Sequence, residues 1–368
     1  MLLLAAGLAL AAPFGPLGSG ALRLEALPGG LAAMVALGVV LGVLALTPRA
    51  PQGWPLIIGL AAALNGAWAS LAVLGLPGVA GAARSGFWLM VLASWLGAAM
   101  LVSALAALRP VTKTMTRLVA VAVPSLFGLY LFYLWEVIVR GFGVPAVLMP
   151  PPSMIAARIA VSLPVLAADF TQTFLKGVLS GYVLGSLAGF AVALVADRVP
   201  FLRRGLLPIG NFVSALPIIG IAPIMVMWFG FDWPSKAAVV AVVTFFPMLV
   251  NAVAGLSATG PLERDLMRSY GAGWGQTLIK LRLPAALPFL FNALKINSTL
   301  ALIGAIVAEY FGTPIVGMGF RISIEAGRMA LDMVWAEIAL AAVAGTLFYG
   351  LIAFVERQVT FWHPSYRR

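Results

Sequence analysis

Asp265-Leu266-Met267-Arg268-Ser269-Tyr270-Gly271 is followed, after nine residues, by Leu281-Arg282-Leu283-Pro284. This polar stretch separates two apolar segments, 236–256 and 288–311, each of which is long enough to cross a membrane. A polar stretch between two membrane spans must lie at one face of the bilayer. It is therefore predicted to be a loop with a structure of its own.

Apolar side chains recur at every fourth position of this loop, which predicts one apolar stripe along a helix. The stripe consists of Leu262, Leu266, Tyr270, Trp274 and Leu278. Glycine costs about 1 kcal/mol in a helix interior and tolerates tight turns. A break into two short helices is therefore expected at Gly271, Gly273 and Gly275. The composition of the loop alone also fits an ordinary solvated loop.

The spacing of this stretch resembles the cytoplasmic coupling motif of permease subunits in binding-protein-dependent ABC importers. In that family the motif begins with Glu-Ala-Ala, continues to a Gly and an aliphatic-x-Leu-Pro, and docks on the ATPase subunit. Asp265 keeps the acidic character of the first position, whereas larger side chains replace the two alanines. The residues that the resemblance assigns to ATPase coupling are Asp265, Leu266, Met267, Arg268, Tyr270, Gly271, Ala272, Leu281 and Pro284.

The composition is that of a protein that crosses a membrane several times. The 368 residues are 62% apolar and only 10% charged, and the mean hydropathy is +1.06, whereas soluble domains are about 45–50% apolar and about 25% charged. The net charge of +11 would suggest nucleic acid as a partner of a soluble protein. Here the distribution of basic residues between loops explains it better, so the expected surroundings are a lipid bilayer and no nucleic acid.

Ten segments are predicted to span the membrane, since a span needs roughly 20 mostly apolar residues. They are 1–18, 30–46, 54–75, 86–108, 117–139, 171–195, 206–229, 236–256, 288–311 and 334–355. The first segment could instead be the core of a signal peptide, but it lacks the usual basic residues before the apolar run. We therefore expect a retained helix, and an all-α polytopic fold.

The orientation follows from Lys and Arg, because cytoplasmic loops are enriched in both. With both termini in the cytoplasm, the more basic side of the membrane contains the coupling loop, 257–287. The same side collects Arg109, Lys113, Arg117, Arg198, Arg203, Arg204 and Arg357. The loop and both termini are therefore predicted to be cytoplasmic, and the resemblance implies the inner membrane of a bacterial cell.

A basic stretch, 109–117, marks a predicted domain boundary. Residues 1–110 form a transmembrane extension of about four helices, which is expected to pack against the rest or to stabilise its assembly. Residues 111–368 form a six-span permease domain, and the resemblance covers about 115–368. Within it, the proline-rich stretch 145–159 and residues 216–235 are similar to the nitrate, sulfonate and taurine branch of the family.

Four glycines recur at every fourth position of one predicted span, which places them on one helix face. They are Gly177, Gly181, Gly185 and Gly189. Small residues in this register let a second helix approach closely. The pattern predicts a tightly packed seam, but it does not indicate which helix fills that seam.

Polar side chains inside the spans need a reason, because each costs a few kcal/mol in the hydrocarbon core. The candidates for a solute pathway are Asn251, Asn292, Asn297 and Glu309. A structural role remains an equal alternative for Asn297 and Glu309. Lys295 is expected to extend to the cytoplasmic surface instead.

The chain contains no Gly-x-x-x-x-Gly-Lys-Ser/Thr loop for nucleotide phosphates. It also lacks a His-Glu-x-x-His or Gly-x-Ser-x-Gly motif, has no cysteine, and carries its single histidine, His363, near the end of the chain. No enzyme activity, metal or cofactor is therefore expected of this chain itself.

The resemblance implies that a separate subunit uses ATP and that a second copy of this chain completes the pathway. It also implies a periplasmic or lipid-anchored solute-binding protein as a partner. The solute would be a small polar or anionic organic molecule, such as a sulfonate, nitrate, or a vitamin or pyrimidine precursor. The alternative is a secondary active transporter, for which we would expect matching halves with broken helices and a mid-membrane carboxylate.

Overall fold

The computed structural model describes residues 12–362 except 18–19, 23–26, 28, 46–53, 109–111, 200, 203, 207, 210–216 and 313–314. The described fold is helical, with one short hairpin. The chain divides into two compact units, Met1–Ala156 and Ala157–Arg368. The domain boundary predicted at 110/111 lies outside the described residues and stays a prediction.

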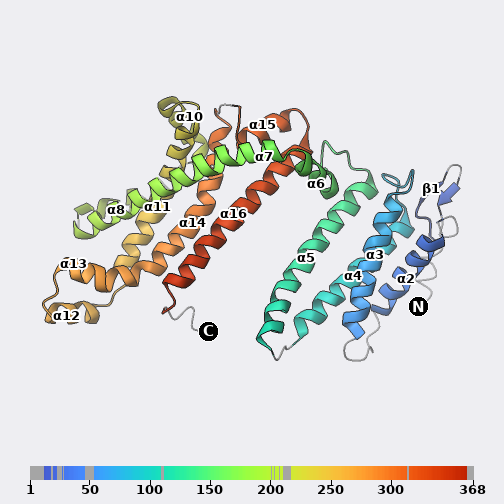
Figure 1. The fold of residues 1–368 in the computed structure, drawn as a ribbon, viewed down its shortest axis with the longest axis horizontal. Helices are drawn as coiled ribbons and strands as arrows, with labels where there is room; N and C mark the ends of the chain where they lie inside the picture. Colours follow the sequence, from blue (N-terminus) through green and yellow to red (C-terminus); the bar gives the residue numbers. More distant parts are fainter. Residues whose placement is uncertain are drawn as a thin grey trace. The chain divides into compact units, whose positions relative to one another are not determined.

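The described part of the first unit consists of a hairpin and four long helices (Figure 1). Its elements are β1 (Gly15–Leu17), β2 (Gly20–Leu22), α2 (Gly29–Ala45), α3 (Trp54–Leu74), α4 (Ser85–Ala107) and α5 (Lys113–Phe142). The helix predicted over 1–18 is therefore wrong at its end, where β1 pairs antiparallel with β2. Pro13 and Pro16 explain the difference, since proline lacks the N–H that a helix interior requires. Residues 1–11 lie outside the described part.

Two hydroxyl pairs join α5 to the helices before it. The Tyr133 hydroxyl lies 2.8 Å from Ser70 Oγ on α3, and the Tyr130 hydroxyl pairs with Ser94 on α4. Such hydrogen bonds between helices provide partners for polar side chains, since lipid tails cannot form hydrogen bonds. The described extension is thus a packed unit of its own, and it holds α5 by polar as well as apolar contacts.

The described part of the second unit is built from four long helical stretches and shorter helices around them (Figure 1). Its elements are α7 (Leu163–Phe170), the π-helix η2 (Thr171–Val178), α8 (Leu179–Arg198), α10 (Ile218–Phe229), α11 (Trp233–Leu256), α12 (Pro261–Ser269), α13 (Trp274–Thr277), the π-helix η3 (Leu278–Arg282), α14 (Leu283–Glu309), α15 (Met318–Gly327) and α16 (Leu331–Val359). A further helix, α6 (Pro152–Val161), precedes α7.

Within the described residues, seven helical stretches are long and apolar enough to cross a membrane. They coincide with seven of the predicted spans, which confirms a polytopic α-helical protein. The span predicted at 30–46 corresponds to the 17-residue α2. The span predicted at 206–229 corresponds at its end to the 12-residue α10, and 210–216 lie outside the described residues.

The glycine face of η2 and α8 packs against α11. A Cβ atom added to Gly181 would lie 2.5 Å from the carbonyl oxygen of Ala237 on α11, and Gly185 and Gly189 face the same helix as closely. A Cβ atom on Gly177 would lie at an ordinary 3.5 Å from the Cβ atom of Lys236. The seam is therefore tightest along α8, where the two backbones approach each other.

Substitution of Gly181 by Ala is expected to destabilise the protein by about 1–3 kcal/mol, because the added methyl group meets a backbone oxygen that cannot move aside. Gly177→Ala is the matched control on the same face, since its methyl group finds ordinary contact distance. Thermal unfolding of the detergent-purified variants measures the difference. Equal midpoints for both variants would contradict the packing described here.

Candidate coupling site and solute pathway

The predicted loop contains two short helices separated by a glycine turn. α12 ends in a Schellman motif, in which the N–H of Ala272 donates to the Met267 carbonyl at 3.0 Å and the N–H of Gly271 donates to the Arg268 carbonyl at 2.9 Å. Gly271 has a left-handed φ of 68°, which suits glycine at this position. The bend that the sequence predicts at Gly271 therefore has a defined backbone geometry.

The second helix, α13, begins directly after this turn. Its N-cap is Gly273, whose N–H donates to Gln276 Oε1 at 3.2 Å. Gly275 lies inside α13 and does not break it. The predicted break therefore involves Gly271 and Gly273 but not Gly275, because a cost of about 1 kcal/mol for one glycine does not by itself end a helix.

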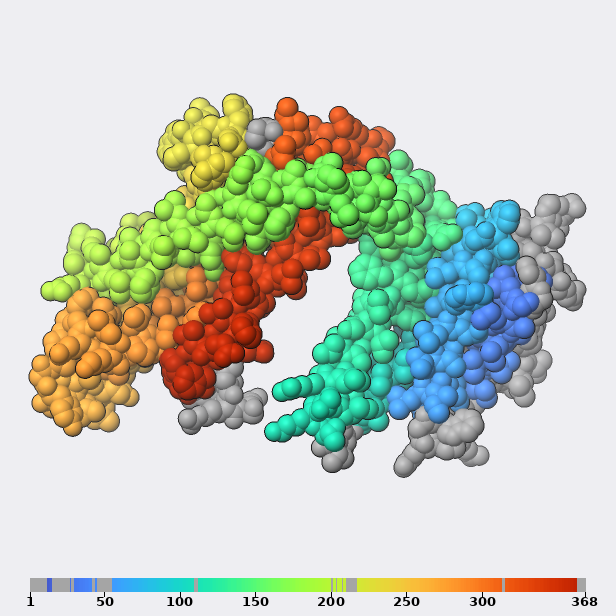
Figure 2. Space-filling model, in the orientation of Figure 1, coloured from blue at the N-terminus to red at the C-terminus, as the bar shows by residue number. Residues whose placement is uncertain are grey.

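α12 has no buried residue, and large apolar side chains lie on its surface. Leu266 is 56% exposed and Tyr270 is 82% exposed. Asp265 and Arg268 form an exposed ion pair with a 3.6 Å separation. Figure 2 shows the segment at the surface at one end of the second unit. Exposed apolar side chains that are surrounded by polar residues are typical of a protein interaction site.

The other residues assigned to coupling are less exposed. Met267, Ala272, Leu281 and Pro284 are all half-buried. They are spread over α12, the glycine turn, η3 and the start of α14.

Arg282 is a residue of this region that sequence reasoning missed. Its guanidinium donates from Nη1 and Nη2 to the two carboxylate oxygens of Asp197, at 2.7 and 2.5 Å. It also donates from Nε and Nη2 to the Leu256 carbonyl, at 3.0 and 2.8 Å. No local pattern could have indicated this contact, since 85 residues separate Arg282 from Asp197.

The pathway candidates on α11 and α14 form a hydrogen-bonded amide pair near the surface and a buried pair. In the amide pair Asn292 is exposed and Asn251 is half-buried, and Asn292 Nδ2 lies 3.3 Å from Asn251 Oδ1. The same face of α14 continues with Ile296, Thr299 and Ile303, which are also exposed. An exposed amide and an exposed hydroxyl in a membrane span need water or polar partners, so this face is suited to a hydrated surface rather than to lipid.

Asn297 lies on the opposite side of α14 and is fully buried. Its Nδ2 donates to Ser186 Oγ at 3.1 Å and to the Thr244 carbonyl at 2.8 Å. These bonds join α14 to α8 and α11. In this conformation Asn297 holds three helices together and has no contact with solvent.

Glu309 is also buried, and it belongs to a polar cluster that caps α15. It accepts from Thr173 Oγ1 at 2.8 Å and from the Gly319 N–H at 2.7 Å. Asp169 accepts from the Gly317 N–H at 2.6 Å and from Arg321 Nε at 2.9 Å. Carboxylates suit the N-terminus of a helix, where N–H groups lack partners. The cluster thus ties the end of α14 to α15.

A family model described as "Binding-protein-dependent transport system inner membrane component" matches residues 181–361. The formylaminopyrimidine transport permease protein of Halalkalibacterium halodurans is 30% identical over 242 residues, which are 66% of this chain and 96% of that protein. The chain belongs to this family.

Other relatives agree with this assignment. The riboflavin transport system permease protein of Chloroflexus aurantiacus is 28% identical to this chain. The match covers 67% of this chain and 91% of that relative. The taurine transport system permease protein of Escherichia coli is 26% identical to this chain. The match covers 62% of this chain and 85% of that relative. These relatives are transport permeases and not enzymes.

The predicted function class is therefore confirmed. The protein is a membrane permease of a binding-protein-dependent ABC importer, of the type to which sulfonate and taurine permeases belong. The alternative of a secondary active transporter receives no support from these relatives. The family match contains the whole coupling segment, α12 to η3.

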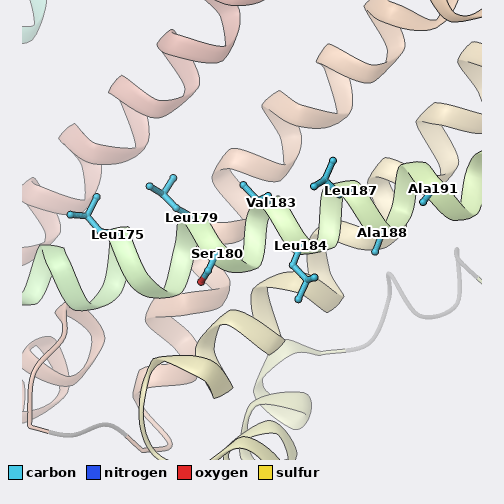
Figure 3. A pocket seen from close by; sticks show the side chains of 8 residues that line it. All are labelled: Leu175, Leu179, Ser180, Val183, Leu184, Leu187, Ala188 and Ala191. Carbon is cyan, nitrogen blue, oxygen red and sulfur yellow. The ribbon is translucent and has the colours of Figure 1, made fainter. Parts of the chain in front are cut away.

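A second exposed face of the permease lies along η2 and α8 (Figure 3). It forms a shallow surface lined by Leu175, Leu179, Ser180, Val183, Leu184, Leu187, Ala188 and Ala191. Its only side-chain polar atom is the Ser180 hydroxyl, which donates to the Lys176 carbonyl of the preceding turn. This apolar face is suited to lipid or to another apolar helix, in contrast to the amide-bearing face of α14.

Asp232 caps α11 outside the predicted spans. The pKa of this carboxyl lies below its ordinary value, first because the Gln172 side-chain amide donates to Oδ1 at 2.7 Å, and then because the Trp233 N–H also donates to it at 2.7 Å. Both bonds favour the charged carboxylate.

The lowered pKa predicts a loss of stability in acid. The contribution of Asp232 is fully present above its unfolded-state pKa of about 3.9, and it is lost as the pH falls through the lower folded-state value. The wild-type permease should therefore lose more thermal stability than Asp232→Asn over this range. Unfolding midpoints measured against pH test this, and parallel profiles would contradict it.

Proposed function

We propose that the exposed surface of α12 docks on a separate ATPase subunit, which hydrolyses ATP and drives the permease. The observation that carries this proposal is that Leu266 and Tyr270 are exposed beside the charged pair Asp265 and Arg268. Such a surface is unfavourable in water without a partner. The family membership supports the nature of that partner, since importers of this family work with an ATPase.

In this mechanism, closure of two ATPase subunits moves α12 and α13 of each permease. The left-handed backbone at Gly271 sets the angle between α12 and α13, and the two helices keep this angle as they move together. The movement switches the spans between an inward-open and an outward-open state, and ATP favours one of the two. The coupling surface and both termini lie in the cytoplasm of a bacterial cell, and the permease lies in the inner membrane.

The solute pathway forms between two copies of the permease. Asn292, Asn251 and Thr299 line it, because Asn292 and Thr299 are exposed along α14 in a single copy and the half-buried Asn251 on α11 is hydrogen-bonded to Asn292. Amides and hydroxyls both donate and accept hydrogen bonds. They are suited to a small polar or anionic organic solute, of the riboflavin, pyrimidine-precursor or sulfonate type that the names of the relatives indicate.

An external binding protein, periplasmic or lipid-anchored, delivers this solute. It also determines much of the selectivity, because the proposed lining is uncharged and makes few specific contacts. The binding protein encoded beside the permease is therefore the best source for the identity of the solute.

Reconstitution tests the proposal. The permease is placed in liposomes with the ATPase and binding protein encoded beside it, and uptake of labelled riboflavin, formylaminopyrimidine and taurine is measured. We expect uptake of one solute that requires both partners and internal ATP. Uptake by the permease alone, driven by a proton gradient, would overturn the proposal.

A further inference from the structure

We propose that Arg282 and Asp197 form the connection through which movement of the coupling segment reaches α8 and α11. This inference rests on the proposed docking of an ATPase on α12. It adds that Arg282 is a positioning residue, which transmits the movement without touching the ATPase or the solute.

The geometry of Arg282 is that of a joint between three elements. Arg282 is the last residue of η3, Asp197 lies in the last turn of α8, and Leu256 is the last residue of α11. One guanidinium thus joins the coupling segment to the ends of two long helices. A displacement of η3 must either move both helix ends with it or break these bonds.

The bonds are of the strong kind. The two parallel N–H···O bonds to Asp197 form the planar fork that arginine makes with carboxylates, and both partners are charged. The Arg282 side chain is 12% exposed and that of Asp197 is 4% exposed. Water therefore has little access to compete for the pair. A lysine could keep the charge but could not form the fork and reach the Leu256 carbonyl as well.

A second contact reinforces the same link. The guanidinium of Arg198, the neighbour of Asp197, lies 5.0 Å from the centre of the Trp274 ring at the start of α13. This distance is typical of a cation–π interaction. The end of α8 therefore holds both ends of the segment from α13 to η3, at Trp274 and at Arg282.

Another arginine of the loop, Arg264, does not make such a connection. Arg264 on α12 donates to Thr259 Oγ1 at 2.9 Å and to the Ser257 carbonyl at 3.1 Å. Both partners belong to the short connection between α11 and α12. Arg264 thus orders the loop, whereas Arg282 reaches across to a distant helix.

The test compares ATPase stimulation in complete transport complexes. Arg282→Gln and the nearly isosteric Asp197→Asn are each assembled with the ATPase and with solute-loaded binding protein. The ATPase should remain bound, because the surface of α12 is untouched. The ratio of stimulated to unstimulated hydrolysis should fall by about tenfold, the factor that one charge-assisted hydrogen bond is worth. Arg282→Lys should show the same fall, since the fork is lost.

The matched control is Arg158→Gln. It breaks the ion pair between Arg158 Nε and Asp332 Oδ2, which are 2.7 Å apart at the start of α16 and far along the chain from the coupling segment. It should leave the stimulation ratio as in the wild type. A general loss of stability would lower the yield of every variant, but it would not lower the ratio in the assembled complexes alone.

The outcomes separate this inference from the proposed function. If wild-type permease does not bind or stimulate the ATPase, the proposed function fails and the inference falls with it. If the wild type is stimulated and Asp197→Asn or Arg282→Gln is stimulated equally, only the inference is overturned. A normal ratio for Arg282→Lys overturns the role of the fork.

Discussion

Tyr270→Glu and Leu266→Glu should each weaken binding of the ATPase by at least about tenfold, and together they should abolish it and the transport it drives. Both side chains are exposed and make no contribution to the packed interior. Truncation of a central interface residue commonly costs about 2 kcal/mol or more, and a buried unpaired carboxylate costs more. The ATPase retained on affinity-purified permease measures the effect.

Met329→Glu provides the control for this pair of substitutions. Met329 is an apolar side chain of similar exposure, 66%, between α15 and α16. The same change of charge should leave ATPase retention unaffected there. Retention of the ATPase by the double variant would show that α12 is not the docking surface.

Lys295→Met is expected to destabilise the permease by about 3–5 kcal/mol, because it leaves a buried carboxylate without its partner. Lys295 Nζ lies 2.7 Å from Glu356 Oε2 on α16, and the two side chains are 20% and 7% exposed. The sequence did not indicate Glu356 as the partner of Lys295. A cation inside a span is stabilised by the nearest available anion.

The double variant Lys295→Met/Glu356→Leu should recover most of the lost stability, since replacing both charges by apolar groups removes the unpaired carboxylate. Thermal unfolding midpoints of the wild type, both single variants and the double variant form a complete cycle. A loss in the double variant equal to the sum of the two single losses would show that the pair contributes nothing to stability.

Local sequence patterns were sufficient to predict several features. The spans at α11 and α14 follow from apolar length, and the bend at Gly271 follows from the low cost of left-handed backbone at glycine. The four-residue glycine spacing predicted a seam, although only the structure identifies α11 as the helix that fills it. Residues close in sequence share a helix, so their relation is fixed by helix geometry.

Contacts between distant segments could not be predicted in this way. The partners of Arg282, Lys295 and Asn297 depend on how helices pack, and a single sequence contains no signal for that. Asn297 illustrates the limit, because a buried amide that binds Ser186 has the same local sequence signature as one that faces a pathway. Glu309 is a second example, since its partners lie on η2 and α15.

α14 is one unbroken helix of 27 residues from Leu283 to Glu309, about 40 Å long at 1.5 Å per residue. Arg282 precedes its first turn, and Glu309, in its last turn, holds the N-terminus of α15. A continuous helix that is held at both ends transmits a displacement of one end to the other end. Under the coupling proposed above, a displacement of η3 would therefore reach the N-terminus of α15 through the whole length of α14.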